Sequence, residues 1–222
     1  MKKIVFPFLS IAMLGLSGCF KSGDNIQTFP EMPAVVDFYT SPFQPMIITP
    51  YGSYFAPDLL NAMGTDLNDE DAIWTTFSIN YDQQPASAMY YTVSDMEYIK
   101  VGKSDLSTSS GDDFNAPIED MQVIWRSGNV LFFFFRHTAP ADQKYIYEMT
   151  YDYTDPSVAY IRAKENGTGL QQSGTFVYLY AFDIQFFRYN NKEFNMMYYT
   201  GVDEEGNDVY KPWSGNPYEI DE

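Results

Sequence analysis

The sequence MQVIWRSGNVLFFFFR, residues 121–136, decides the fold class. Its two apolar runs, Met121–Arg126 and Val130–Arg136, flank Ser127-Gly128-Asn129, and a short Gly/Asn connection of this kind is typical of a β-hairpin. Residues 131–135 are apolar at every position. A strand of this composition is buried on both faces, so the pattern predicts a strand at the centre of a β-sandwich.

Strand patterns continue on both sides of this hairpin. Residues 73–81 alternate between apolar and polar side chains, and the Asn/Gly-containing turn 203–208 separates two further runs that we expect to pair. The chain holds 19 Tyr and 18 Phe, and aromatic residues favour strands. Further strands are expected at residues 34–40, 46–49, 51–55, 89–93, 96–101, 145–153, 158–163, 175–189, 194–200 and 209–211. The one helix predicted is 57–63, with Pro57 at its first position and Gly64 after its end.

The composition excludes several classes of function. Of the 222 residues, 30 are Asp or Glu and 13 are Lys or Arg, which gives a formal net charge of −17. Nucleic acid is therefore excluded as a partner, because phosphate binding needs Lys and Arg. The single Cys excludes an internal disulfide framework and a CxxC metal site, and the single His excludes a multi-His zinc site.

The N-terminus has the pattern of a bacterial lipoprotein signal. Lys2 and Lys3 precede an apolar stretch that is too short to span a membrane, and Leu16-Ser17-Gly18-Cys19 follows. This tetrapeptide resembles the lipobox, in which the chain is cut before the Cys and the Cys is acylated. The resemblance implies that residues 1–18 are a signal peptide and that Cys19 is the lipid attachment site. An ordinary signal peptide with an incidental Cys is the alternative.

These features predict a protein of the cell envelope whose partner is the membrane, reached through the lipid anchor. Residues 19–33 are polar and contain Gly and Pro, so we expect a flexible tether there. Removal of residues 1–18 changes the net charge to −19, which should repel the body from anionic headgroups. Phe20 follows Cys19 where an inner-membrane retention signal would have Asp, so the outer membrane is favoured.

A polar stretch divides the rest of the chain. Residues 104–117 are rich in Ser and Asp and cannot bury much apolar area, so we interpret them as a linker. The predicted parts are a small β unit at 34–103, an antiparallel β-sandwich at 118–216 and a frayed acidic tail at 217–222. The predicted fold class is therefore all-β.

This order of parts, placed after a lipobox, resembles the NigD-like lipoproteins of Bacteroidetes. The resemblance implies that the small unit is OB-like and that the protein serves the cell envelope in a biochemical role that has not been assigned. Those proteins often carry a run of Asp after the lipidated Cys, and this chain does not. No functional residue transfers from the resemblance.

No catalytic motif stands out. A Ser–His–Asp triad would need His137, the only His, and the chain has no G-x-S-x-G elbow. Asp183 lies in an aromatic run, where we expect a structural ion pair with Arg162 or Arg188 in preference to an acid catalyst. With 30 acidic residues, pairs that would suit a glycoside hydrolase are abundant and uninformative. We therefore predict a non-enzyme without a resident cofactor.

Calcium is the one ion that the sequence suggests. Asp66-x-Asn68-x-Glu70 resembles the first ligands of an EF-hand loop, but Asp71 replaces the required Gly and Phe77 the final Glu. An irregular Ca²⁺ loop could use Asp66, Asn68, Asp69 and Asp71. A second acidic loop offers Asp203, Glu205, Asn207 and Asp208. A solvated acidic loop is the simpler interpretation of both.

Exposed aromatic residues could bind a glycan, because sugar rings stack on Trp and Tyr faces. Trp74 and Trp125 lie in predicted core strands, whereas Trp213 lies in a Pro- and Gly-containing loop and is the candidate for ligand stacking. Three hypotheses follow: a non-enzymatic binding module for an unknown protein or glycan partner, a glycan-binding lipoprotein of a polysaccharide-uptake system, and a carboxylate-based glycoside hydrolase.

Overall fold

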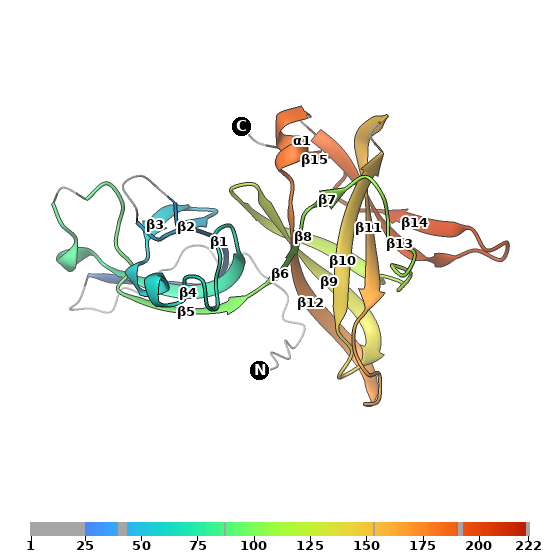
Figure 1. Ribbon diagram of the computed structural model, residues 1–222, viewed down its shortest axis with the longest axis horizontal. Helices are drawn as coiled ribbons and strands as arrows, with labels where there is room; N and C mark the ends of the chain where they lie inside the picture. Colours follow the sequence, from blue (N-terminus) through green and yellow to red (C-terminus); the bar gives the residue numbers. More distant parts are fainter. Residues whose placement is uncertain (1–24, 40–43, 87, 153, 191–192, 221–222) are drawn as a thin grey trace. The chain divides into compact units, whose positions relative to one another are not determined.

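The computed structural model describes residues 25–39, 44–86, 88–152, 154–190 and 193–220 (Figure 1). It contains 59% strand and 7% helix, which confirms the all-β prediction. The chain divides into two compact units. Unit 1 holds the described residues up to Val101 together with Arg126–Gly128. Unit 2 holds Gly102–Trp125 and the described residues from Asn129 onward.

Unit 1 is a curled antiparallel sheet of five strands in the order β3-β2-β1-β4-β5. The backbone N–H of Phe55 donates to the carbonyl of Tyr91, and the N–H of Val93 donates to the carbonyl of Phe55. These bonds join the end of β3 to the segment before β5, as expected of an OB-like, partly open barrel. The strands are β1 (Ile26–Asp37), β2 (Met46–Thr49), β3 (Gly52–Phe55), β4 (Ala72–Asn80) and β5 (Asp95–Lys100).

Strand β1 overturns most of the predicted tether. Residues 26–33 pair with β4, with Phe29 opposite Phe77, so the prediction of a tether over 19–33 is wrong from Ile26 onward. Two prolines made this stretch look irregular. The strand accommodates Pro30 in a β-bulge, where Glu31 has a positive φ of 41° and donates its N–H to the Thr76 hydroxyl at 3.0 Å.

Unit 2 is a sandwich of two sheets. One has the order β14-β13-β11-β10-β7, with β15 also paired to β13, and the other has the order β6-β12-β9-β8. The strands are β6 (Gly102–Ser104), β7 (Leu106–Ser107), β8 (Asp120–Ser127), β9 (Val130–Pro140), β10 (Tyr145–Asp152), β11 (Asp155–Glu165), β12 (Ser173–Asp183), β13 (Glu193–Val202), β14 (Asp208–Pro212) and β15 (Tyr218–Glu219). Strand β9 contains residues 131–135 and lies between β12 and β8, as predicted.

The sandwich is not purely antiparallel. Strand β7 pairs parallel with β10, β6 parallel with β12, and β13 parallel with β11. Strand β7 lies within the stretch 104–117 that we predicted to be a linker, and β6 ends at its first residue, Ser104. Polar residues form a short edge strand in this stretch, which the composition did not indicate. Ala116 also forms an isolated β-bridge with Ala163. Parallel pairing needs a long crossover connection, so sequence alternation alone does not reveal it.

Aromatic rings from both sheets fill the core of unit 2. Phe133 and Phe135 of β9 are fully buried, and the ring of Phe135 stacks on Tyr147 of β10 at 4.1 Å. Tyr180 of β12 also contacts Tyr147, with the ring centroids 5.1 Å apart. These contacts join the two sheets face to face, and aromatic pairs of this kind stabilise by about 0.5–1.5 kcal/mol beyond the area they bury.

Three other predicted elements differ from those in the structure. The strand expected over 175–189 stops at Asp183, whose carboxylate accepts the Gln185 N–H at 2.8 Å and starts helix α1 (Gln185–Asn190). The helix expected over 57–63 is a 3₁₀ turn, η1 (Pro57–Asn61), because so short a segment gains little from α-helical bonds. The tail expected to fray includes β15, and Ile220 is buried.

We expect Phe29→Ala to lower the free energy of unfolding by about 3–5 kcal/mol, because it removes a buried ring that stacks on Phe77 at 4.8 Å. Urea unfolding of the chain without residues 1–18 measures the change. Thr28→Ala, at an exposed neighbouring position, should cost about 1 kcal/mol or less. Equal midpoints for Phe29→Ala and the unaltered chain would contradict the assignment of residues 26–33 to the folded unit.

Candidate functional site

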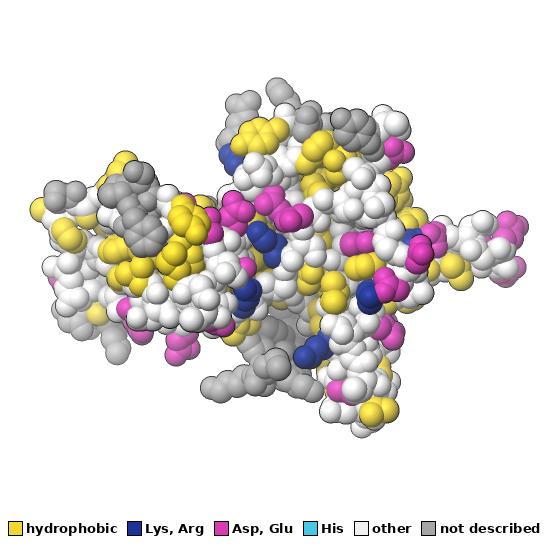
Figure 2. Space-filling view, in the orientation of Figure 1, with side chains coloured by type: hydrophobic (Ala, Val, Ile, Leu, Met, Phe, Trp, Pro, Cys, Tyr) yellow, Lys and Arg dark blue, Asp and Glu magenta, His cyan; other side chains and the backbone are white. Residues whose placement is uncertain are grey.

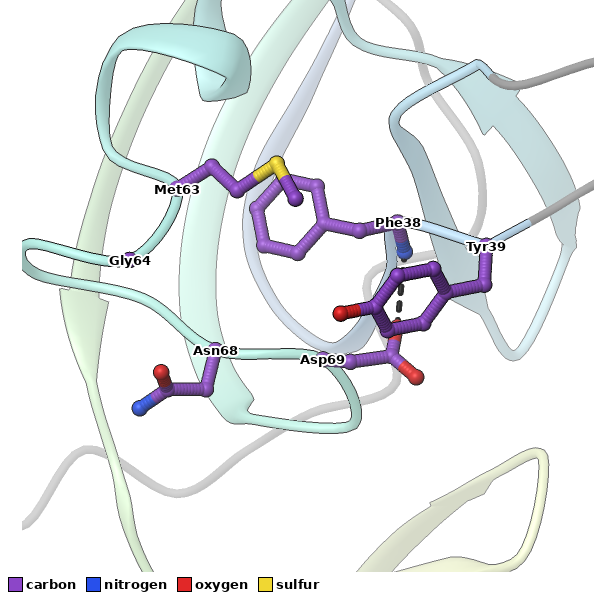
Figure 3. Close-up of a pocket in the computed structure, with 6 residues that line it drawn as sticks. All are labelled: Phe38, Tyr39, Met63, Gly64, Asn68 and Asp69. Carbon is purple, nitrogen blue, oxygen red and sulfur yellow. Dashed lines mark hydrogen bonds between the residues drawn. The ribbon is translucent and has the colours of Figure 1, made fainter.

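A small recess in unit 1 combines an exposed aromatic ring with polar side chains (Figure 3). Its volume is about 240 Å³, and we name it the Tyr39 recess. The residues that line it come from the end of β1, from the segment after η1 and from the loop before β4: Phe38, Tyr39, Met63, Gly64, Asn68 and Asp69. Figure 3 shows the Tyr39 hydroxyl pointing into the space between Met63 and Asn68.

Backbone hydrogen bonds hold the walls of the recess in place. The Asp69 carboxylate accepts the Phe38 N–H at 2.7 Å, and Glu70 and Asp71 exchange backbone hydrogen bonds with Val36 at 2.8 and 3.0 Å. Gly64 adopts a positive φ of 73°, which only glycine tolerates well, and the chain turns there so that Gly64 and Leu67 bond. The loop is therefore fixed against the end of β1.

The recess suits a small, neutral, polar ligand. Tyr39 is 69% exposed and presents a ring face, while the Asn68 side chain makes no hydrogen bond within the described residues. One Asp69 oxygen accepts the Phe38 N–H, so the second can accept from a ligand hydroxyl. The volume lies below the range of about 300–1,000 Å³ typical of pockets for drug-sized ligands. The volume suits a single ring-sized group.

The candidate calcium ligands do not converge. The Asp66 carboxylate accepts from the Tyr98 hydroxyl at 2.8 Å, and Asp71 accepts from the Lys100 ammonium at 2.6 Å and from the Asn68 N–H at 2.7 Å. Asp69 bonds to Phe38, as described above. Within the described ranges, no group of three or more acidic, His or Cys side chains could hold a metal ion. A calcium ion at Asp66, Asn68, Asp69 and Asp71 stays a prediction that this arrangement does not favour.

The second acidic loop is arranged as a turn. Asp203 accepts hydrogen bonds from the backbone N–H groups of Asn207 and Glu205, which hold the pKa of its carboxyl below the usual range. Asp208 instead pairs with Arg162. Acidic side chains gather at the tip of this β13–β14 hairpin (Figure 2). The carboxylate of Asp203 stabilises the turn there by accepting these hydrogen bonds.

A second, larger recess lies on the β4–β5 loop, which we define as the described residues 81–86 and 88–94. Its volume is about 370 Å³, and Ser53, Gln84, Met89, Tyr90 and Tyr91 are among the residues that line it. The Gln84 amide closes the base of the loop. Its nitrogen donates to the carbonyls of Asn80 and Thr92 at 2.8 and 3.1 Å, and its oxygen accepts the Thr92 N–H at 2.7 Å.

The two residues that were weighed as possible catalytic groups, His137 and Asp183, make structural contacts. His137 is 2% exposed, stacks on Tyr145 at 3.9 Å and bonds to the Tyr147 hydroxyl at 3.0 Å. Burial lowers the pKa of His137 to about 4. Asp183 caps α1, whereas Arg162 bonds to Tyr210 and Arg188 to Asn129. The expected ion pair of Asp183 with Arg162 or Arg188 is therefore wrong, because the carboxylate serves the helix start.

Trp213, the predicted stacking residue, is only partly exposed. It packs against the core of unit 2, and a Cβ built on Gly215 would lie 2.4 Å from its indole ring. One edge of the ring is thus covered by its own turn, and its role in ligand stacking stays a prediction. Trp125, expected in the core, is 40% exposed because β8 is an edge strand of its sheet.

Sequence patterns predicted neither recess. Tyr39 falls in the strand predicted over 34–40, and the strand predicted over 89–93 is instead part of the loop between β4 and β5. One feature of the amino-acid composition could have indicated the recess on the β4–β5 loop. Residues 83–94 contain no charged residue, although 19% of the chain is charged, and such a stretch in an acidic protein marks a surface that avoids charge.

Comparison with known proteins establishes the fold alone. A Bacteroides vulgatus protein of unknown function, DUF1344, is 16% identical with a TM-score of 0.52, and the match covers 87% of this chain and 92% of that one. A Bacteroides fragilis protein named "Putative lipoprotein" is 11% identical with a TM-score of 0.53 and coverage of 84% and 96%. A NigD-like immunity protein from Bacteroides caccae is 9% identical with a TM-score of 0.46 and coverage of 88% and 98%.

No family model and no curated protein matches the sequence. Cys19, the predicted lipid attachment site, lies outside the described residues. Within the described part of the chain, every helix is too short or too polar to cross a bilayer.

The burial of His137 predicts a loss of stability in acid. The folded state keeps the ring neutral down to a pH of about 4, whereas the unfolded chain protonates it below about 6.5, so protons favour unfolding between these values. We expect the unaltered chain to lose about 2–3 kcal/mol more unfolding free energy than His137→Gln between pH 7.5 and pH 4.5. Urea titrations at both pH values measure this, and equal losses in the two proteins would contradict it.

Proposed function

We propose that this protein is a cell-envelope lipoprotein, held on the outer membrane by lipid on Cys19, and that it works as a non-enzymatic binding module. The observation that carries the proposal is the sequence Leu16-Ser17-Gly18-Cys19, which contains the only Cys of the chain. Its position supports the assignment, because the folded β1 begins at Ile26, seven residues after Cys19. A lipid there would hold the domain without disturbing it.

The anchor is strong enough for the task. Acyl chains contribute about 0.8 kcal/mol per buried CH₂, and stable anchoring needs more than one chain. The lipobox resemblance implies several chains on one residue. The body, with a net charge of −19 after cleavage, has no electrostatic attraction of its own to anionic membranes.

Cys19→Ser should abolish membrane retention in the native host, because it removes the acceptor sulfur. Cell fractionation with intact-mass analysis measures both the location and the N-terminus. We expect the unaltered protein to begin at Cys19 and to carry the added mass of acyl chains. A free thiol at Cys19, or a mature chain that starts elsewhere, would overturn the proposal.

Glycan binding is the second candidate function, and the Tyr39 recess favours it. An exposed ring face beside an amide and a carboxylate offers stacking and hydrogen bonds to one neutral sugar. Trp213 is the other candidate for stacking. Among the described residues, no Lys or Arg lines the recess, so a neutral sugar suits it better than an acidic one.

Tyr39→Ala should weaken binding of a neutral glycan about tenfold, or ~1.4 kcal/mol, if the recess is the site. The glycan is first identified on an array with the soluble chain, and calorimetry then compares the variants. Tyr189→Ala, which removes an equally exposed ring from unit 2, is the matched control and should bind normally. Trp213→Ala tests the alternative residue. No glycan bound at high micromolar concentration, or affinity unchanged in both Tyr39→Ala and Trp213→Ala, would remove this function.

A further inference from the structure

The start of the folded domain lies close to the proposed lipid. Asn25 is the first described residue and stands six residues after Cys19. Even a fully extended chain spans at most about 3.6 Å per residue, so Asn25 can be no more than about 22 Å from the Cα of Cys19. The end of unit 1 that holds Asn25 must therefore stay near the bilayer surface.

Asn25 is bonded directly to the base of the β4–β5 loop. Its carbonyl accepts the Tyr81 N–H at 2.9 Å, and its own N–H donates to the Asp82 carboxylate at 3.4 Å. The Tyr81 ring then meets Tyr91 edge to face, with the ring centroids 5.1 Å apart. In Figure 1, the blue start of β1 and the green loop that joins β4 to β5 lie at the same end of unit 1.

This loop has the composition of a surface that enters a lipid headgroup region. Met89 is 86% exposed, Tyr91 51% and Tyr90 38%. Tyr places an apolar ring and a polar hydroxyl at the level where a membrane changes from apolar to wet, and Met adapts to irregular apolar surroundings. The loop has no charged residue after Asp82, whose carboxylate faces Asn25.

Hydrogen bonds also fix the base of the loop in place. The three hydrogen bonds of the Gln84 amide close its base, and the Tyr91 carbonyl accepts from Phe55 at the end of β3. A loop with a hydrogen-bonded base loses less conformational freedom on docking than one without such bonds, which lowers the entropic cost of using its exposed apolar side chains.

We propose that the β4–β5 loop docks on the same bilayer that carries the lipid of Cys19, with Met89 entering the headgroup region and Tyr90 and Tyr91 at its level. This inference rests on the proposed lipidation of Cys19. The surface that it fits is zwitterionic, because the loop offers no cation to anionic headgroups and the acidic body is repelled by them.

Docking would point the Tyr39 recess away from the membrane. Within the β1–β4 ladder, Ile26 pairs with Asn80 at one end and Val35 with Ala72 at the other. The β4–β5 loop follows Asn80, whereas Phe38 and Asp69 lie beyond the second pair. Strand β4 has nine residues, so the two ends are about 25 Å apart at ~3.3 Å per residue.

A single thiol probe tests the proposal, because Cys19 is the only native Cys and its sulfur is acylated. The lipidated Met89→Cys protein is labelled with an environment-sensitive fluorophore and reconstituted into phosphatidylethanolamine–phosphatidylcholine vesicles that contain nitroxide-labelled lipid. Lipidated Asn68→Cys, exposed at the opposite end of the β1–β4 ladder, is the matched control. Intact mass establishes acylation of each sample before the measurement.

We expect lipid quenching of the Met89 probe to exceed that of the Asn68 probe about twofold or more, with a blue-shifted emission only for Met89. A Tyr91→Glu substitution added to Met89→Cys should reduce the quenching, because it brings a charge into the contact. Equal quenching at the two positions in acylated protein would overturn the docking of the loop while leaving the anchor intact. Absence of acyl mass would instead overturn the proposed function on which docking rests.

Discussion

The bulge in β1 is the constraint on which the geometry of unit 1 depends. One long strand must pair with β2 over Val35–Asp37 and with β4 between Ile26 and Val35, and the register shift between Phe29 and Met32 permits both. Pro30 has no N–H to offer, and the Thr76 hydroxyl satisfies the N–H of Glu31. The bulge keeps Phe29 in the core and thereby extends the folded domain to Ile26. The shortness of the segment after Cys19 follows from this one irregularity.

Several Asp side chains of this protein accept hydrogen bonds that stabilise turns, which leaves them less suited to bind ligands. The Thr168 hydroxyl and the backbone N–H groups of Leu170 and Gln171 lower the pKa of Asp142 to about 2. The pKa of Asp152 is lowered by hydrogen bonds from the Thr154 hydroxyl and N–H, and that of Asp203 by hydrogen bonds from the N–H groups and the Asn207 side chain of its own turn. A carboxylate already bonded to N–H donors has fewer lone pairs for a cation, and cation binding would have to break those bonds. Many acidic side chains close together therefore do not make a metal site.

Sequence patterns predicted the fold where the local signal and the tertiary structure agree. Residues 131–135 are apolar on both faces and form an interior strand, and the alternation of 73–81 corresponds to β4. Predictions were wrong where one contact overrides local preference, as at Asp183, which ends an aromatic strand by capping α1, and at Pro30, which a bulge accommodates. The Tyr39 recess could not be predicted, because Tyr39 and Asn68 are 29 positions apart and are brought together by long-range hydrogen bonds such as that of Phe38 to Asp69.

The two recesses of unit 1 differ in the chemistry that their surroundings permit. The Tyr39 recess has a carboxylate and an amide beside its ring, and these groups gain only from a ligand that brings hydroxyl or amide partners. The recess on the β4–β5 loop has exposed Met and Tyr side chains and an amide, that of Gln84, whose oxygen and nitrogen are already bonded to the loop. Such a surface gains from removal of apolar area from water and needs no specific polar partner. The β1–β4 ladder keeps these two surfaces at its opposite ends, so a bilayer and a soluble ligand would not compete for the same face of unit 1.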